Sequence, residues 1–301
     1  MIIATHRHWF FALTGLIVAA SIASFAVYGL KPGIDFTGGT YARVAFTGER
    51  PSTEQMDAQL TTAGVKGYSV RAAGEHDYDI RVAESGAEIQ SAIVGAVATG
   101  NAFQGTVTEM SQIGPTIGAE LRTKAYLSIA LVLLCILLFI AFAFRKVSRP
   151  VSSWVYGVIA LVTLLHDVIV PVGFYAALGH FVGAEVDTLF VTAILTILGF
   201  SIHDTIVVFD RVRENLKLNQ EHGKKEPFVE IAGHSLRQTF VRSVNTSLTV
   251  LITLAILFFV GPASTQYFAL TLLVGIVAGT YSSIFLATPL LIEMARRSNK
   301  A

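Results

Sequence analysis

The sequence predicts a polytopic α-helical membrane protein with six transmembrane helices and one inserted extracytoplasmic α+β domain. Three observations predict this class. Hydrophobic residues make up 53% of the 301-residue chain and charged residues only 14%, whereas soluble domains carry about a quarter of charged residues. Six apolar runs are each long enough to cross a bilayer as a helix. One longer segment of ordinary polar composition separates the first run from the second.

The first apolar run, Trp9 to Leu30, follows Arg7 and could be interpreted as a signal peptide. It is longer than the apolar core of a signal peptide and no clean small-x-small cleavage site follows it, so we expect an uncleaved helix within residues 1–30. Residues 125–301 are expected to form a bundle of five further helices. Their predicted spans are about 125–144, 151–178, 188–209, 243–260 and 268–292.

The distribution of Lys and Arg predicts the orientation. Basic residues gather in alternate connections and at the end of the chain, in segments 145–149, 211–237 and 296–300. The connections 179–187 and 261–267 contain neither Lys nor Arg. Because basic residues concentrate in cytoplasmic loops, both termini are expected in the cytoplasm and residues 31–124 outside it.

The segment 31–124 predicts a small α+β domain. Its pattern of strands and helices has the order βαββαβ, which favours a ferredoxin-like sheet with helices on one face. The expected elements are strands at 40–47, 67–72, 78–83 and 105–113 and helices at 52–63 and 87–98. Ser52 and Gln55 fit a capping box. The core of this segment is too modest for us to expect an enzyme, so a docking module is favoured. The segment contains no Cys and only one histidine, His76, which argues against a metal site.

Asp204 lies well inside the predicted span 188–209, where an ionisable side chain needs a partner or a water-lined path. It could be a carboxylate that only pins two helices together, but we favour one that takes up and releases protons. Arg242, at the cytoplasmic mouth of the span 243–260, is the expected cationic partner. Arg237 is the competing partner and is expected to be solvated.

His203 is one residue, or about 100° of helix rotation, from Asp204. It is either a neutral histidine that donates to a carbonyl on a neighbouring helix or a weaker member of a proton relay. Asp167 follows His166 in the span 151–178 and also needs a partner. We expect Asp167 to support helix packing, and we rank it as a weaker proton-coupling residue.

Metal, cofactor and nucleic-acid chemistry are not expected. The two His–Asp pairs would bind a metal only if they converged, and the sequence does not indicate this. The net charge of +1 indicates no nucleic-acid partner. The glycine-rich segment Gly33 to Thr40 predicts a tight turn rather than a phosphate cradle, because no Gly-Lys-Ser/Thr signature accompanies it. The single Cys135 allows no intrachain disulfide.

Small residues recur at a spacing of four in two of the predicted spans. They are Gly275, Gly279 and Ser283 in the last span and Gly15, Ala19 and Ala23 in the first. Such spacing places small side chains on one face of a helix and lets another helix approach closely. We therefore expect close helix contacts at both stripes, either within the chain or with a partner.

Five ordered motifs carry a resemblance to a known family. They are Gly33 to Thr40, with Asp35, Gly38 and Gly39; Ile113 to Arg122, with Gly114 and Pro115; Leu165 to Val168; Gly199 to Asn215; and Gly279 to Phe285. Together they resemble the SecD/SecF family of protein-export membrane proteins, of the resistance-nodulation-division superfamily. The chain departs from the family pattern at His203, where the family usually has Asn, and in a longer, Lys-rich loop around 217–227.

The resemblance implies a function in protein export that uses the proton-motive force. It implies that Asp204 matches the family's essential carboxylate and that Arg242 matches its arginine. The implied partners are SecD, the SecY-SecE-SecG channel, YajC as a lesser partner, the unfolded polypeptide in transit and membrane lipid. The implied location is the bacterial cytoplasmic (inner) membrane, and neither an enzymatic activity nor a cofactor is implied.

Two other functions remain open from the sequence. A proton-coupled exporter of small molecules would share the fold, but such transporters usually carry two six-span halves in one chain. An intramembrane hydrolase would need a nucleophile or a metal, and no convincing Ser/His or His-Glu-x-x-His arrangement is present.

Overall fold

The computed structural model describes residues 7–48, 50–74, 76–98, 105–144, 152–223 and 226–298. The chain divides into two compact units. The first consists of Met1–Leu30, Ser128–Ala184 and Leu189–Ala301, and the second of Lys31–Leu127 and Glu185–Thr188. The short segment 185–188 connects two helices of the first unit and yet belongs to the second.

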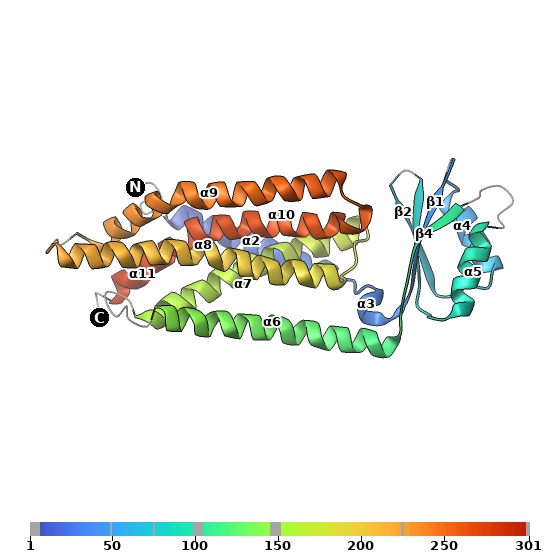
Figure 1. The fold of residues 1–301 in the computed structure, drawn as a ribbon, viewed down its shortest axis with the longest axis horizontal. Helices are drawn as coiled ribbons and strands as arrows, with labels where there is room; N and C mark the ends of the chain where they lie inside the picture. Colours follow the sequence, from blue (N-terminus) through green and yellow to red (C-terminus); the bar gives the residue numbers. More distant parts are fainter. Residues whose placement is uncertain are drawn as a thin grey trace. The chain divides into compact units, whose positions relative to one another are not determined.

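The first unit is built from long helices that lie side by side (Figure 1). In chain order they are α2 (Arg7–Tyr28), α6 (Pro115–Ala143), α7 (Ser153–Phe181), α8 (Thr188–Glu221), α9 (Phe228–Val260) and α10 (Gln266–Ser282). A 3-10 turn, η1 (Ala263–Thr265), precedes α10, and a π-helix, η2 (Ser283–Ala287), joins α10 to α11 (Thr288–Ser298). Six helices of the described chain have the length and hydropathy of membrane spans, which confirms the predicted fold class.

Several helices extend beyond the apolar runs that predicted them. α8 continues to Glu221, and α9 begins at Phe228, ahead of the polar stretch that starts at Ser243. This stretch does not interrupt the helix, because hydroxyls in it bond within the helix or reach across to α8. Thr249, for example, donates to the carbonyl of Thr246 at 2.7 Å.

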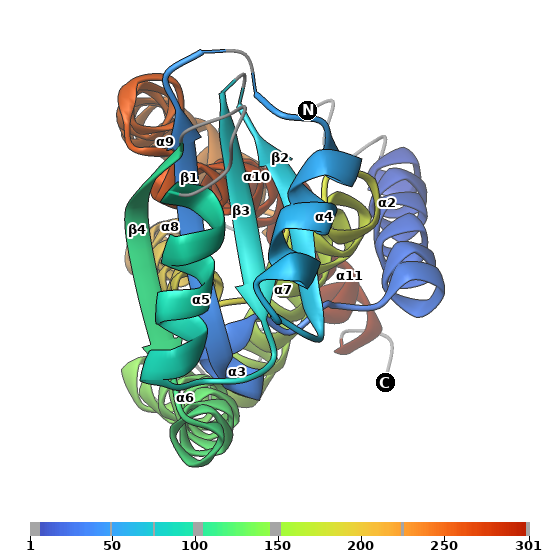
Figure 2. The same cartoon turned by 90° about the vertical axis from the view of Figure 1, so that its right-hand side faces the viewer.

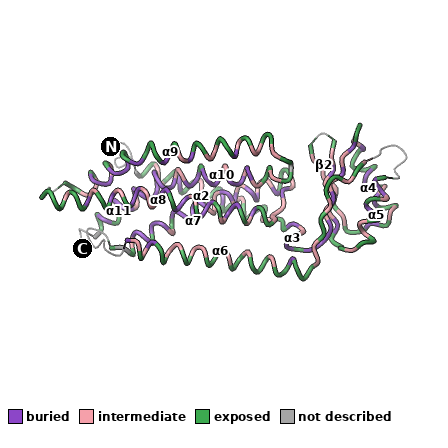
Figure 3. The backbone as a smooth tube through the Cα atoms, in the orientation of Figure 1, coloured by how far each residue is buried: buried purple, intermediate pink, exposed green. Residues whose placement is uncertain are grey.

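The helices differ in how much of their surface the chain itself buries. Half of the most apolar window of α7 and of α8 is buried, and 61% in the last span, but only 6% in α6 and 17% in α9 (Figure 3). The core contains an aromatic cluster in which Phe144 stacks on Tyr156 with ring centroids 5.2 Å apart. Long exposed apolar faces are expected on helices that face lipid or another membrane chain.

The second unit contains a four-stranded antiparallel sheet. Its elements are β1 (Gly39–Phe46), α4 (Thr53–Thr62), β2 (Tyr68–Ala73), β3 (Asp77–Val82), α5 (Ala87–Ala98) and β4 (Gly105–Ile113). The strand order is β2-β3-β1-β4, and α4 and α5 cover one face of the sheet (Figure 2). The predicted βαββαβ order is confirmed.

Packing between this sheet and its two helices forms the core of the second unit. Val44, Ile80, Met56, Leu60 and Ile93 are all fully buried there. The predicted capping box begins α4: the Ser52 hydroxyl accepts from the Gln55 N–H, and the Gln55 side chain accepts from the Ser52 N–H at 2.8 Å. The apolar side chains that alternate along the strands therefore point toward the two helices.

The glycine-rich segment predicted as a tight turn contains one helical turn, α3 (Ile34–Thr37), followed by two glycines in left-handed conformations. Gly38 has φ 77° and Gly39 has φ 131°. A Cβ on Gly39 would lie 2.4 Å from the carbonyl oxygen of Val82, and one on Gly38 would lie 2.8 Å from the Cα of Pro115. Only glycine fits both the conformation and the space.

Candidate functional site

Asp204 lies on the buried face of α8, with 2% of the residue exposed. Its Oδ2 accepts a hydrogen bond from the Ser247 hydroxyl of α9 at 3.4 Å. The Ser247 oxygen in turn accepts from the Thr280 hydroxyl of α10 at 2.6 Å. A long hydrogen bond of this kind compensates little of the desolvation of a buried carboxylate. Asp204 is therefore a buried carboxylate with a single long hydrogen bond among the described residues.

The structure does not bring Arg242 to Asp204. Arg242 is exposed on α9, and no ion pair joins it to Asp204 among the described residues. It belongs to a row of exposed polar side chains at helical spacing, which consists of Gln238, Arg242, Asn245, Thr249 and Thr253. The direct pair that the sequence favoured is absent, because Ser243 and Ser247, not Arg242, lie on the buried face of α9.

His203 is exposed, whereas its neighbour Asp204 is buried. In the described part of the chain it makes no hydrogen bond to a carbonyl of a neighbouring helix, which was one of its two expected roles. Arg237 is exposed as well. His203 and Arg242 thus occupy surfaces of α8 and α9 that this chain leaves uncovered.

Asp167 is fully buried, and it is the best hydrogen-bonded carboxylate within the bundle as described. Its Oδ1 pairs with Nδ1 of His166 at 2.7 Å, and its Oδ2 accepts from the hydroxyl of Ser282 at 2.8 Å and from that of Ser201. These donors come from α7, α10 and α8, so the carboxylate joins three helices. The sequence singled out Asp167 but did not identify Ser201 and Ser282, because hydroxyls inside an apolar span are usually satisfied by their own helix.

Two of the predicted packing glycines hold α10 against α8. A Cβ on Gly275 would lie 2.2 Å from Cδ1 of Ile197, and one on Gly279 would lie 3.0 Å from Cβ of Ser201. The other stripe, in α2, behaves differently: a Cβ on Gly15 would meet nothing within 4 Å. Close packing in α10 therefore brings the hydroxyls of the Asp167 cluster within reach, whereas the α2 stripe is exposed.

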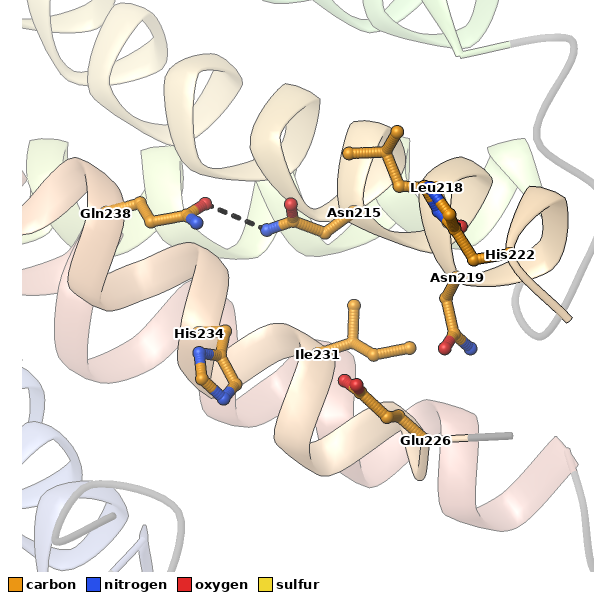
Figure 4. A pocket seen from close by; sticks show the side chains of 8 residues that line it. All are labelled: Asn215, Leu218, Asn219, His222, Glu226, Ile231, His234 and Gln238. Atoms are coloured by element: carbon orange, nitrogen blue, oxygen red, sulfur yellow. Dashed lines mark hydrogen bonds between the residues drawn. The ribbon is translucent and has the colours of Figure 1, made fainter. Parts of the chain in front are cut away.

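A pocket of about 300 Å³ lies between the end of α8 and the start of α9 (Figure 4). Its lining is mostly polar, and the Asn215 side chain donates to Gln238 at 2.9 Å across it. The lining residues are Asn215, Leu218, Asn219, His222, Glu226, Ile231, His234 and Gln238. Among the described residues no group of three or more His, Cys, Asp or Glu side chains could hold a metal ion.

Asp35 of the glycine-rich motif binds the first residue of α8. Its Oδ2 accepts from the Thr188 N–H at 2.8 Å and from the Thr188 hydroxyl at 2.7 Å. The same connection pairs with the segment before β1, because the N–H of Gly33 donates to the carbonyl of Val186 at 2.8 Å. Residues 185–188 are therefore held in part by hydrogen bonds to Gly33 and Asp35 of the glycine-rich motif.

Glu185, in the same connection between α7 and α8, contacts the sheet. It forms an ion pair with Arg81 of β3 at 3.0 Å and a longer one with Arg71 of β2 at 3.6 Å. Burial raises the pKa of the Glu185 carboxyl, and the two guanidinium groups only partly offset this rise. Glu185 of the connection between α7 and α8 thus contacts the sheet through charged side chains.

Comparisons with known proteins agree with these features. Residues 93–297 match the family described as protein export membrane protein SecD/SecF, C-terminal, and residues 23–48 match the SecD/SecF GG motif. The chain is 42% identical to the protein translocase subunit SecF of Thermobaculum terrenum, over 95% of this chain and 92% of that protein. It is 37% identical to the subunit of the same name from Sebaldella termitidis, over 98% and 91%.

Two solved structures of SecDF also match this chain. The crystal structure of SecDF from Thermus thermophilus, described as a translocon-associated membrane protein, superposes with a TM-score of 0.85 at 31% identity. The match covers 99% of this chain and 39% of the SecDF chain. A second crystal structure of SecDF, described as a super-membrane-facing form, has a TM-score of 0.66. The fold, the two family matches and the near full-length identity together place this chain in the SecF branch of the SecD/SecF family.

Proposed function

We propose that this chain is the SecF-type subunit of a SecD–SecF complex that promotes protein translocation across the bacterial cytoplasmic membrane. The complex uses the proton-motive force and works with the SecY-SecE-SecG channel, with YajC as a lesser partner. The translocated cargo is an unfolded polypeptide, and the chain acts as a transporter subunit rather than an enzyme. In this arrangement both termini are cytoplasmic and the outer domain is on the far side.

The observation that carries the proposal is the buried Asp204 in a membrane span. Protonation removes a charge that the surrounding bundle stabilises poorly, so the protonated and ionised forms favour different packing. The membrane potential supplies about 2.3 kcal/mol per elementary charge per 100 mV, which suffices to bias two packings of similar energy. Asp204 is proposed as the principal proton carrier, with His203 and Asp167 as weaker participants.

The exposed polar row on α9 supports a membrane partner. A guanidinium that faces lipid is unfavourable, by about 3 kcal/mol at the centre of a bilayer and by less toward the membrane surface. Arg242 and Asn245 are both exposed in this chain, which favours another chain that covers them. We propose that the six spans of SecD do so, and that Arg242 acts on the proton cycle from within this interface.

A route from the proton site to the outer domain runs along α8. This helix carries Asp204 in its middle, and its first residue, Thr188, is bound by Asp35. A displacement of α8 would therefore act on the segment 31–40 through two hydrogen bonds and on β3 through Glu185. The outer domain would then move together with the polypeptide that it carries as cargo.

The test uses the complex with its SecD partner in cells and in inverted membrane vesicles. Asp204→Asn keeps the size of the side chain and removes its titration, so gradient-dependent translocation should be lost while the complex still assembles. Asp204→Glu should retain part of the activity. Asp210→Asn is the matched control, because Asp210 is an exposed carboxylate on the same helix. Full gradient-dependent translocation by the Asp204→Asn complex would refute the proposed proton site.

A further inference from the structure

The bundle contains a second buried carboxylate whose surroundings differ from those of Asp204. Asp167 accepts hydrogen bonds from His166, Ser201 and Ser282, so both of its oxygens are occupied. Such a set of donors suits the ionised form of a carboxylate, which only accepts hydrogen bonds. A fully buried negative charge still favours a neighbouring positive charge over a neutral donor.

His166 can supply that positive charge. Its Nδ1 pairs with Asp167, and in the neutral ring this leaves Nε2 without a proton. Nε2 is buried and has no hydrogen-bond partner among the residues that the structure describes. Taking up one proton at Nε2 converts a neutral ring beside an anion into an imidazolium–carboxylate pair with no net charge. Histidine is the side chain best suited to make this change near neutral pH.

An opening lies next to His166. A groove of about 440 Å³ runs between α2, α7 and α10 and is lined by His166, Tyr281 and apolar side chains of the three helices. The Tyr281 ring lies 6.1 Å from that of His166, centroid to centroid, and its hydroxyl bonds to that of Thr14 at 3.1 Å. Tyr281 is the titratable group that faces the pair from α10. From α8 the nearest is Asp204, about one helical turn beyond Ser201.

We propose that His166 and Asp167 form a second proton-binding site, in which His166 Nε2 takes up the proton and Asp167 holds the resulting cation. The proposal rests on the proton-driven function proposed above and adds a site to it. Asp167 is then a positioning residue for the imidazolium, and the groove lies beside the ring that takes up the proton.

Hydroxyls on α10 connect the two sites. Ser282 bonds to Asp167, and Thr280, two residues earlier, bonds to the Ser247 hydroxyl that donates to Asp204. Ser283 bonds to Thr205 of α8 at 2.9 Å. These residues lie where α10 becomes the π-helix η2, a kind of segment that is frequent at functional sites. A change of protonation at one site therefore alters the helix that the other site also uses.

The first test observes the histidine directly in the complex with the SecD partner. Histidine is labelled with ¹⁵N, and the His166 signals are assigned by their loss in His166→Asn. Between about pH 8 and about pH 5 we expect Nε2 to change from an unprotonated to a protonated nitrogen while Nδ1 keeps its proton. Asp167→Asn should abolish the Nε2 change in this range. A His166 Nε2 that keeps one protonation state throughout would overturn the proposal.

The second test measures translocation in vesicles. Asn at position 166 keeps an amide N–H near the place of Nδ1, so the donor to Asp167 remains and only Nε2 is lost. We expect His166→Asn to lower gradient-dependent translocation several-fold at unchanged assembly. His234→Gln, an exposed histidine of α9, should leave it unchanged. Equal translocation by both variants would overturn a role for the site in the proton cycle.

The two proposals fail separately. Asp204→Asn should stop translocation and leave the Nε2 change of His166 in place. If Asp204→Asn keeps full translocation, the function assigned to Asp204 is wrong, whatever His166 does. If His166 does not titrate while Asp204→Asn is inactive, only the second site is wrong.

Discussion

Asp35 caps the helix that carries Asp204, because its Oδ2 accepts both the N–H and the hydroxyl of Thr188, the first residue of α8. A carboxylate at this position satisfies an N–H that has no partner within the helix and also interacts favourably with the helix dipole. The glycine-rich motif therefore does more than turn the chain, because its hydrogen bonds also connect the start of the second unit to the first residue of α8.

The first prediction concerns this cap. Asp35→Ala should destabilise the segment around Thr188 by about 1 kcal/mol, the usual effect of losing a capping side chain, and should speed hydrogen exchange at the first amides of α8. Asp35→Asn keeps an oxygen acceptor and should have a smaller effect. Hydrogen exchange followed by mass spectrometry on the whole complex measures both. Equal exchange in the Ala variant and the parent would show that the cap contributes nothing.

The second prediction concerns pH and Glu185. Its folded-state pKa is raised by burial, so the folded chain binds this proton more tightly than the unfolded chain does. The stabilisation is complete below the ordinary pKa of glutamate and is lost as the pH rises through the raised value. Protection of residues 78–83 from hydrogen exchange should therefore decrease across this window.

Glu185→Gln should remove this pH-dependent component, since the amide does not titrate, although it weakens the ion pairs with Arg81 and Arg71. Glu84→Gln is the control, because Glu84 is exposed in the same domain. The prediction is wrong if the Gln variant and the parent lose protection in parallel as the pH rises.

The third prediction concerns the contact of α10 with α8. Gly275→Ala places a methyl group 2.2 Å from Cδ1 of Ile197, which forces the helices or the side chain to move. Overpacking of this kind usually destabilises by about 1–3 kcal/mol. Ile197→Ala should restore part of the stability of Gly275→Ala, so the two changes should couple in a double-mutant cycle of thermal unfolding. Strictly additive effects would argue against the contact.

The fourth prediction separates the two arginines of α9. Arg242→Ala should weaken co-purification with SecD by about tenfold or more, because it removes a charged group from the proposed interface. Arg237→Ala should not, because Arg237 lies nearer the start of the helix and outside the polar row. Binding of detergent-solubilised chains gives the two affinities. Equal loss in both variants would move the interface away from Arg242.

Much of this architecture was predictable from local patterns. Apolar length identifies the six spans, alternation identifies the strands, and the Ser52–Gln55 pair identifies the start of α4. Each of these signals is carried by residues close together in the chain, and each is produced by burial or by a helix end. Asp204 and Asp167 could be singled out for the same reason, since a carboxylate inside an apolar run is unfavourable wherever the helix packs.

The side chains that face each carboxylate are determined by contacts between helices that are distant in the sequence. The sequence predicts SecF-type spans, the βαββαβ domain and two buried carboxylates, because apolar period and length act locally. It favoured Arg242 as the partner of Asp204, and only the tertiary structure turns Ser247 toward Asp204 and leaves Arg242 exposed. Rotation of a helix about its axis is set by packing such as that of Gly275 on Ile197, and no single run of residues contains that information.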